Sequence, residues 1–261
     1  MSPTENPPLP MEMRAPAKLT LSLRVTGVRS DGYHLLDAEM VTLDLADTLH
    51  FCAGDGLDVE MGEFGGPQMR GADVPTDGSN LVVRALALVA RRAHVRLVKR
   101  IPAGAGLGGG SADAAAVLRW AGLSGASGRQ VAMVLGSDVP FCLAGGGRAR
   151  VAGVGEVLEP LPFDEVAGEP YTLILPPFGV VTKAVYEAWD EMGGPTSDNL
   201  NDLEPAALRV EPRLAQWRDR LGEATGLRPQ LAGSGSTWFV RGEHPGPDRL
   251  VVRVARGPGP T

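Results

Sequence analysis

The 261-residue sequence predicts an α+β fold with two domains. Segments of period-two hydrophobicity indicate β-strands, and an alanine-rich segment in the middle of the chain indicates an α-helix. Strands and helices do not alternate as regular βαβ units, so a doubly wound parallel sheet is disfavoured. Residues 160–170 contain proline, glycine and acidic residues without periodicity, and we expect them to link the two domains.

The N-terminal half is predicted to combine strands with capped helices. Between Arg14 and Thr26 apolar and polar residues alternate, which indicates a strand with one core face. Asp31-Gly32 is a hairpin signal, and Ser79 or Asn80 can cap a helix that continues to Arg92. The other elements expected here are strands at 38–51 and 95–100, a loop-rich segment at 54–77, helices at 111–121 and 129–135, a turn at 136–141 and two strands before residue 161.

The C-terminal part is predicted to mix strands and helices in the same way. Its expected elements are a strand at 171–175, helices at 182–192 and 212–221, a strand-turn-strand unit at 230–240 and a last strand at 250–255.

Composition narrows the class of protein. A hydrophobic content of 43% and a charged content of 21% are typical of soluble globular proteins. The net charge of −6 argues against nucleic-acid binding, and no apolar run approaches the ~18 residues of a membrane span. Cys52 and Cys142 lack metal-ligand spacing, which indicates free thiols in a cytoplasmic compartment. Residues 1–10 are expected to be a disordered lead-in, and the sequence is compatible with a monomer or a homodimer.

The most informative segment is the glycine-rich stretch that begins at Ile101. Five glycines between Gly104 and Gly110 lead into the predicted helix, which Ser111 can cap. Glycine lets a ligand approach main-chain N–H groups without a Cβ in the way, and a helix N-terminus adds unpaired donors and partial positive charge. Together these features predict a phosphate-binding loop.

Three familiar phosphate loops fit this stretch poorly. Gly104, Gly106 and Gly109 match the dinucleotide fingerprint, but residues 124–134 hold no acidic residue for a ribose. A Walker A loop would need lysine where Gly110 stands, and a protein kinase would need H-R-D and D-F-G motifs, which are absent. A dinucleotide oxidoreductase and a glycine-rich linker stay as alternatives of another class.

Lys18 and Asp138 are candidate catalytic residues. Taken alone, Lys18 is a solvated lysine on the polar side of a strand, and Asp138 is a turn-forming residue. Beside a phosphate loop the two suggest phosphoryl transfer, since a carboxylate can accept the proton of an attacking hydroxyl and an ammonium favours the alkoxide. Asp113 is expected to complement the N-terminus of its helix.

Three separated motifs resemble those of the GHMP kinase family. They are Pro16-Ala-Lys-Leu-Thr-Leu, Pro102-Ala-Gly-Ala-Gly-Leu-Gly-Gly-Gly-Ser-Ala and Leu231-Ala-Gly-Ser-Gly-Ser-Thr. Further cues resemble the members that act on a CDP-linked methylerythritol. Besides Pro-Ala-Lys-Leu, these cues are Asp31-Gly-Tyr-His, Asn80-Leu, Lys99-Arg-Ile-Pro, Gly136-Ser-Asp-Val-Pro-Phe and Gly153-Val-Gly-Glu.

The resemblance implies an ATP-dependent kinase that phosphorylates the 2-hydroxyl of this methylerythritol, with Mg²⁺ as cofactor. It also implies a ribosomal-protein S5 domain 2-like domain at 11–164, which binds ATP and carries the catalytic residues. A reduced ferredoxin-like domain at 165–261 would lie on the substrate side. The alternatives are another GHMP small-molecule kinase and a catalytically silent nucleotide-binding sensor derived from one.

Residue roles follow from the matched positions. Lys18 and Asp138 match the catalytic pair, and Ser111 is a candidate Mg²⁺ ligand. The implied ATP-binding residues are Asn80, Lys99, Pro102, Ala103, Gly104, Ala105, Gly106, Leu107, Gly108, Gly109, Gly110, Ser111 and Ala112. The implied substrate-binding residues are Thr20, Tyr33, His34, Thr182, Tyr186, Gly233 and Ser234, of which Tyr33, His34 and Tyr186 would recognise the cytosine.

The sequence departs from the family pattern at three places. Thr20 stands where the family usually has asparagine, and the segment between Asn80 and Lys99 is short. Glycines and prolines within residues 240–250 predict that a helix usual in the second domain is missing.

Overall fold

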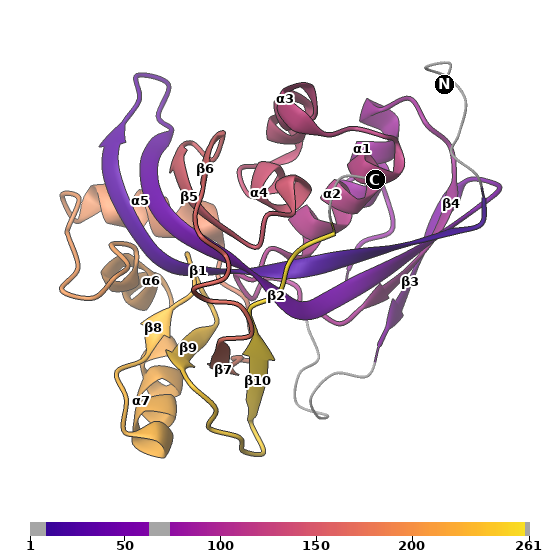
Figure 1. Ribbon diagram of the computed structural model, residues 1–261. Helices are drawn as coiled ribbons and strands as arrows, with labels where there is room; N and C mark the ends of the chain where they lie inside the picture. The colour runs from indigo at the N-terminus through magenta and orange to yellow at the C-terminus, as the bar shows by residue number, and fades with distance from the viewer. Residues whose placement is uncertain (1–8, 63–73, 259–261) are drawn as a thin grey trace.

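A computed structural model describes residues 9–62 and 74–258 and contains two β-sheets with helices packed on them (Figure 1). This arrangement confirms the predicted mixture of strands and helices. The strands are β1 (Met11–Val28), β2 (His34–Cys52), β3 (Gly56–Met61), β4 (His94–Lys99), β5 (Arg148–Gly153), β6 (Val157–Pro160), β7 (Pro170–Ile174), β8 (Gln230–Leu231), β9 (Trp238–Arg241) and β10 (Arg249–Arg253). The helices are α1 (Leu81–Leu88), α2 (Gly109–Trp120), α3 (Gly125–Leu135), α4 (Val139–Ala144), α5 (Thr182–Glu191), α6 (Glu204–Val210) and α7 (Leu214–Thr225).

The first sheet is organised around the long strand β2. Its order is β3-β4-β2-β5-β6, and β1 pairs with β2 along most of its length, with Met11 opposite Phe51 and Val28 opposite His34. β4 pairs with one end of β2 and β5 with the other. Helices α1 to α4 lie together on one side of this sheet (Figure 1).

The second sheet is antiparallel, with the order β10-β7-β9-β8. It lies on the side of the first sheet opposite α1 to α4 (Figure 1). The connection from β9 to β10, residues 242–248, contains no helix, in agreement with the glycines and prolines in this segment. Over the described part of the chain, no helix has both the length and the hydrophobicity needed to cross a bilayer.

Packing covers the middle of the first sheet on both faces. One apolar cluster joins the strands to α2, α3 and α4, and a second joins Leu19 and Leu43 to Leu173 and Phe239 of the second sheet. The predicted polar side of β1 is therefore not solvated, because Lys18 is only 4% exposed and Thr20 only 2%. Buried polar side chains need hydrogen-bond partners, and Lys18 finds them in Thr20 and Asp138.

Several predicted boundaries were wrong. β3 lies within the segment predicted to be loop-rich, and part of that segment, 63–73, falls outside the described residues, as does most of the predicted lead-in. Helix α1 ends at Leu88 instead of Arg92, and two residues later Ala90 has φ 52°. Helix α2 begins at Gly109 after the left-handed Gly108, so Ser111 lies inside the first turn and is not the N-cap. The six-residue helix α4 was missed because Pro140, which is tolerated in a first helical turn, resembles a turn signal.

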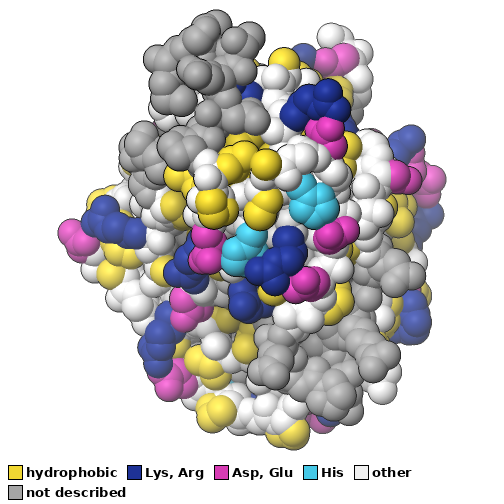
Figure 2. All heavy atoms as spheres, turned by 90° about the vertical axis from the view of Figure 1, so that its right-hand side faces the viewer, with side chains coloured by type: hydrophobic (Ala, Val, Ile, Leu, Met, Phe, Trp, Pro, Cys, Tyr) yellow, Lys and Arg dark blue, Asp and Glu magenta, His cyan; other side chains and the backbone are white. Residues whose placement is uncertain are grey.

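The face formed by β3 and β4 presents charges of both signs side by side (Figure 2). Ion pairs join His94 to Asp58 at 3.0 Å and Arg96 to Glu60 at 3.3 Å, and Arg92 pairs with Asp55. Such a mixed surface does not make the basic stripe that nucleic-acid binding requires. Both cysteines are free, with Cys52 exposed and Cys142 buried.

Candidate active site

The glycine loop between β4 and α2 has a backbone that favours glycine at alternate positions. Gly104, Gly106 and Gly108 have φ values of 72°, 78° and 69°. A Cβ on Gly106 would lie 2.6 Å from the carbonyl oxygens of Ala232 and Gly235. The loop therefore packs directly on the backbone of the third motif, and the first-turn N–H groups of α2 follow it without intrahelical acceptors. This is the geometry of an anion-binding loop.

Lys18 and Asp138 lie side by side at this loop. Lys18 Nζ is 3.3 Å from Asp138 Oδ2 and donates a 3.0 Å hydrogen bond to Thr20 Oγ1. The backbone N–H of Lys18 donates to the carbonyl oxygen of Leu107, and a Cβ on Gly108 would clash with the lysine side chain. Asp138 keeps 28% of its side chain exposed, so an incoming hydroxyl can reach it. Thr20 therefore helps to orient the Lys18 ammonium.

The third motif closes the same site from the second sheet. The Cβ position of Gly233 is 3.6 Å from Lys18 Nζ, and Thr182 Oγ1 lies 2.9 Å from Ser234 Oγ. Thr237 N–H donates to the carbonyl oxygen of Ala105 at 3.2 Å. The structure thus brings together three predicted segments that are far apart in the sequence.

A cavity of about 580 Å³ opens beside the Lys18–Asp138 pair. Tyr33, His34 and Tyr186 line it, as do Gly136 and Ser137, the two residues before Asp138. The ring centroids of His34 and Tyr186 are 4.6 Å apart, while Tyr33 is 64% exposed at the rim. Burial raises the pKa of Tyr186, and the negative charge of Asp138 adds to the shift, so the phenol stays protonated. The three residues predicted to bind cytosine therefore line one cavity, together with the two residues that precede Asp138.

Asn80 lies beside the glycine loop, and its side chain is hydrogen-bonded to the backbone on both sides of it. Its Oδ1 accepts from Val82 N–H at 2.8 Å and its Nδ2 donates to the Pro75 carbonyl oxygen at 2.7 Å, so it is the N-cap of α1. The next residue, Leu81, is in van der Waals contact with the Cβ position of Gly110. Asn80 thus fixes the helix end that flanks the loop.

Lys99 is buried beneath the start of α2. Its ammonium pairs with Asp47 and, at 2.8 Å, with Asp113. Although burial opposes it, the two carboxylates raise the pKa of Lys99 and keep it charged. Asp47 also accepts the N–H groups of Arg100 and Ile101, at 2.5 and 2.8 Å. This buried cluster holds the entrance of the glycine loop, and sequence reasoning missed Asp47 entirely.

Comparisons with known proteins agree with this geometry. Residues 80–146 match the family model described as GHMP kinases N terminal domain. A 4-diphosphocytidyl-2-C-methyl-D-erythritol kinase of Paramagnetospirillum magneticum is 38% identical over 87% of each chain, and one of Ruegeria pomeroyi is 38% identical over 88% of each. The chain belongs to the 4-diphosphocytidyl-2-C-methyl-D-erythritol kinase family of GHMP kinases. A crystal structure of 4-(cytidine 5'-diphospho)-2C-methyl-D-erythritol kinase is also similar, with 33% identity, a TM-score of 0.69, and coverage of 95% of this chain and all of the other.

Membership of this kinase family confirms the fold predicted from the three motifs. The family also implies Mg²⁺, which in phosphoryl transfer is held mostly by phosphate oxygens and water. Among the described residues, no group of three His, Cys, Asp or Glu side chains could hold a metal ion. Ser111, in the first turn of α2, can add one hydroxyl oxygen.

Asn201 is a second residue that sequence reasoning missed in this kinase. It is buried, and its Nδ2 donates to the carbonyl oxygens of Leu231 and Gly233, at 2.9 and 2.7 Å. Its own Oδ1 accepts from Leu203 N–H. No motif around Asn201 indicates chemistry, because its role depends on partners about 30 residues away. The amide holds the third motif against Lys18.

We expect Asn201→Ala to lower kcat by about 10- to 100-fold, because a small displacement of the Gly233 loop misplaces the reacting groups. Asn199→Ala is the matched control, since Asn199 is also buried and donates to a carbonyl oxygen, that of Pro229, outside the loop. Steady-state kinetics and melting temperatures of both variants check this. Equal losses of kcat in the two variants would mean that Asn201 has no special role at the site.

Asp113 makes the stability of the enzyme depend on pH. Burial raises its pKa from 3.8 to about 7, although the Lys99 ammonium opposes the shift. The folded state therefore binds a proton that the unfolded state has released, and the stabilisation, complete below pH 3.8, is lost as the pH rises through about 7. We expect the unfolding free energy of the wild type, relative to Asp113→Asn, to fall between pH 5 and pH 8. Urea unfolding of both proteins at pH 5 and pH 8 measures this difference in unfolding free energy. A difference that does not change with pH would contradict the prediction.

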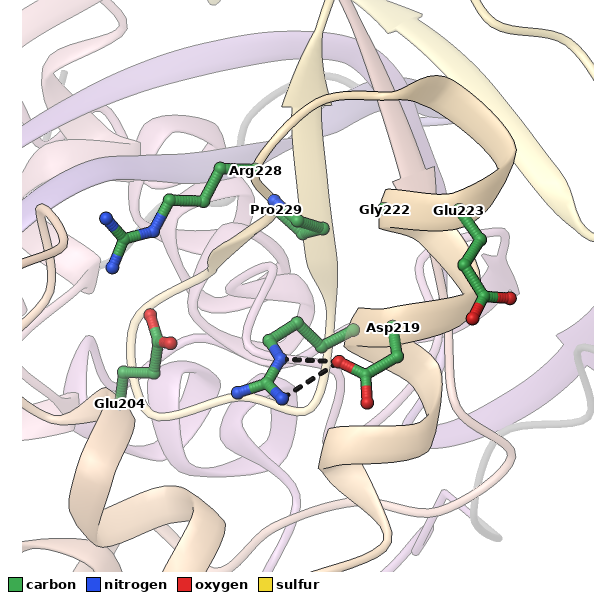
Figure 3. Close-up of a pocket in the computed structure, with 7 residues that line it drawn as sticks. Glu204, Asp219, Gly222, Glu223, Arg228 and Pro229 are labelled. Atoms are coloured by element: carbon green, nitrogen blue, oxygen red, sulfur yellow. Dashed lines mark hydrogen bonds and ion pairs between the residues drawn. The ribbon is translucent and has the colours of Figure 1, made fainter.

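A second cavity lies between α6, α7 and the start of β8, and none of the predicted site residues lines it (Figure 3). Its volume is about 450 Å³, and its lining mixes the acidic Glu204, Asp219 and Glu223 with two arginines. One of these, Arg218, pairs with Asp219 at 2.8 Å. Burial raises the pKa of Glu204, partly opposed by its hydrogen bond from Asn199. The mixed charges give this cavity no preference for an anion.

Proposed function

We propose that this enzyme transfers the γ-phosphoryl group of ATP to the 2-hydroxyl of 4-diphosphocytidyl-2-C-methyl-D-erythritol, giving the 2-phosphate and ADP. The observation that carries the proposal is the position of the Lys18–Asp138 pair, between the glycine loop and the cavity of His34 and Tyr186. A kinase for a nucleotide-linked alcohol needs such a juxtaposition of phosphate loop, base and nucleobase cavity. The names of the similar proteins support the same substrate.

The proposed mechanism uses Asp138 as the general base. As the 2-hydroxyl oxygen attacks the γ-phosphorus, its proton passes to the Asp138 carboxylate, and the bond to the β-phosphate oxygen breaks to release ADP. Lys18 stabilises the developing alkoxide and keeps the carboxylate ionised until it takes the proton. Mg²⁺, when bound, would neutralise phosphate charge, with Ser111 as its protein ligand.

On the nucleotide side we propose that residues 102–112 hold the phosphates of ATP. Asn80 and Lys99 would shape the adenosine side through the start of α1 and the entrance of the loop. On the acceptor side, Thr20, Thr182, Gly233 and Ser234 would surround the methylerythritol, while Tyr33, His34 and Tyr186 bind the cytosine. We further propose the division into domains at 11–164 and 165–261, a cytoplasmic location, and a monomer or homodimer.

A coupled assay of ADP release tests the proposed function. ATP is offered with the CDP-linked methylerythritol, and in parallel with mevalonate, homoserine or galactose. We expect turnover with the CDP-linked substrate alone. Turnover with only one of the other alcohols would contradict the proposed substrate but not the kinase activity. If calorimetry shows that ATP binds but no acceptor leads to ADP release, the protein is a catalytically silent nucleotide-binding protein.

A further inference from the structure

The imidazole of His34 is held by three residues of helix α5. Asp190 Oδ1 lies 2.8 Å from Nε2, the tilted Tyr186 ring lies at 4.6 Å with an interplanar angle of 33°, and Trp189 packs edge-on at 5.6 Å. Tyr186 and Asp190 are four residues apart, so they share one face of the helix. Trp189 is itself fixed by a hydrogen bond from Nε1 to the Pro195 carbonyl oxygen. These contacts fix the position of the His34 ring, and they give Nε2 a defined hydrogen-bond partner, Asp190.

The partner of Nε2 decides what the other nitrogen can do. An ionised carboxylate only accepts hydrogen bonds, so the 2.8 Å contact places the ring proton of a neutral imidazole on Nε2. Nδ1 then carries a lone pair and acts as an acceptor. Among the residues that the structure describes, no other hydrogen bond to the His34 ring occurs, so Nδ1 is the nitrogen left for a ligand in the cavity.

We propose that Asp190 is a specificity-determining residue, which sets the tautomer of His34 so that Nδ1 accepts a hydrogen bond from the exocyclic amine of cytosine. This inference rests on the proposed function. Uracil carries a carbonyl oxygen where cytosine carries this amine, so it would place an acceptor against an acceptor. A buried polar group left unpaired costs far more binding than a missing apolar contact, and such pairing gives sharp discrimination between analogues. Asp190 acts through His34 and does not touch the reacting atoms.

Glu187 provides a matched control for Asp190. Both are acidic residues of the last turns of α5, both line the same cavity, and both are largely exposed. Glu187 pairs with Lys183 at 3.6 Å, and within the described residues no hydrogen bond or ion pair joins it to His34. The variants Glu187→Gln and Asp190→Asn therefore remove the same charge from the same cavity, and only the second removes the acceptor that sets the ring proton. Because both side chains are exposed, neither change should prevent folding.

Inhibition by CDP and by UDP measures the preference for cytosine. The inhibition constants are determined against the CDP-linked substrate for the wild type and both variants, with ATP saturating. We expect Asp190→Asn to reduce the ratio of the UDP to the CDP constant at least about 10-fold, with a higher KM for the substrate and a smaller change in kcat. Glu187→Gln should keep the ratio of the wild type. An unchanged ratio in Asp190→Asn, or an equal loss in both variants, would overturn the proposal.

A second measurement reads the tautomer without any turnover. Nitrogen-15 NMR of the histidine rings at pH 8, above the usual titration range of histidine, distinguishes a proton on Nε2 from a proton on Nδ1. We expect Nε2–H for His34 in the wild type and in Glu187→Gln, and a mixture or Nδ1–H in Asp190→Asn. A charged ring or Nδ1–H in the wild type would overturn the proposal. If the wild type fails to phosphorylate the CDP-linked substrate, the proposed function fails instead, while the NMR result still stands.

Discussion

Asp138→Asn is expected to lower kcat at least about 100-fold, the usual scale for loss of a general base. Asparagine keeps the shape of the side chain, but its amide cannot take the proton of the attacking hydroxyl. The amide also no longer balances the Lys18 ammonium 3.3 Å away. Since Asp138 is partly exposed, the fold should survive, and the KM for ATP should change little. Steady-state ADP release and a thermal melt measure the two effects separately.

Asp164→Asn is the control for this experiment. Asp164 is an exposed residue that pairs with Arg256 at 3.3 Å, well outside the site, so its change should leave kcat near that of the wild type. A wild-type rate in Asp138→Asn would refute the assignment of the base. A loss of similar size in both variants would point to a general effect of the charge.

Lys99→Met is expected to destabilise the enzyme by about 3–5 kcal/mol, the cost of removing one partner from a buried ion pair. The change leaves the carboxylates of Asp47 and Asp113 facing each other inside the protein, with Asp113 Oδ1 already lacking a hydrogen-bond partner. Because Asp47 also holds the backbone of Arg100 and Ile101, the entrance of the glycine loop should loosen. Urea unfolding gives the stability, and the KM for ATP reports the loop.

Lys183→Met is the matched control for the buried lysine. Lys183 is largely exposed and pairs with Glu187 at 3.6 Å, and an exposed pair of this kind contributes only about 0–1 kcal/mol. If Lys99→Met unfolds at the same urea concentration as Lys183→Met, the buried cluster does not stabilise the fold. If the stability falls while the KM for ATP stays constant, the cluster has no influence on the loop.

Local sequence patterns predicted the glycine loop, and the motifs that resemble those of GHMP kinases singled out Lys18 and Asp138, whose side chains lie 3.3 Å apart in the structure. Each of these features lies within a short, contiguous motif. The strand before the glycine loop and the helix after it also have clear hydrophobic periodicity. The same patterns could not reveal Asp47, Asn201 or Asp190. Each of these residues acts on partners that are distant in the sequence, and each lies in a segment whose composition is ordinary for a strand, a turn or a helix.

Two of the expectations changed for physical reasons. The alternation in β1 predicted a solvated polar side, but the second sheet and the glycine loop cover that side, so Lys18 and Thr20 are buried. Ser111 was expected to cap α2, yet the left-handed Gly108 already provides the turn into the helix. The first change comes from a contact between distant segments, and the second from the local backbone conformation of Gly108.

The contact of Gly106 with the carbonyl oxygens of Ala232 and Gly235 bears on how this enzyme could be engineered. The phosphate loop cannot be transferred to another protein on its own, because the backbone on which it packs lies more than 120 residues later in the sequence. In a chimera with the residues up to the glycine loop from one relative and the remainder from another, the loop would still have to pack on the backbone at 232–235. Gly106 and the backbone of residues 232–235 therefore have to be kept together in any such design, although they are far apart in the sequence.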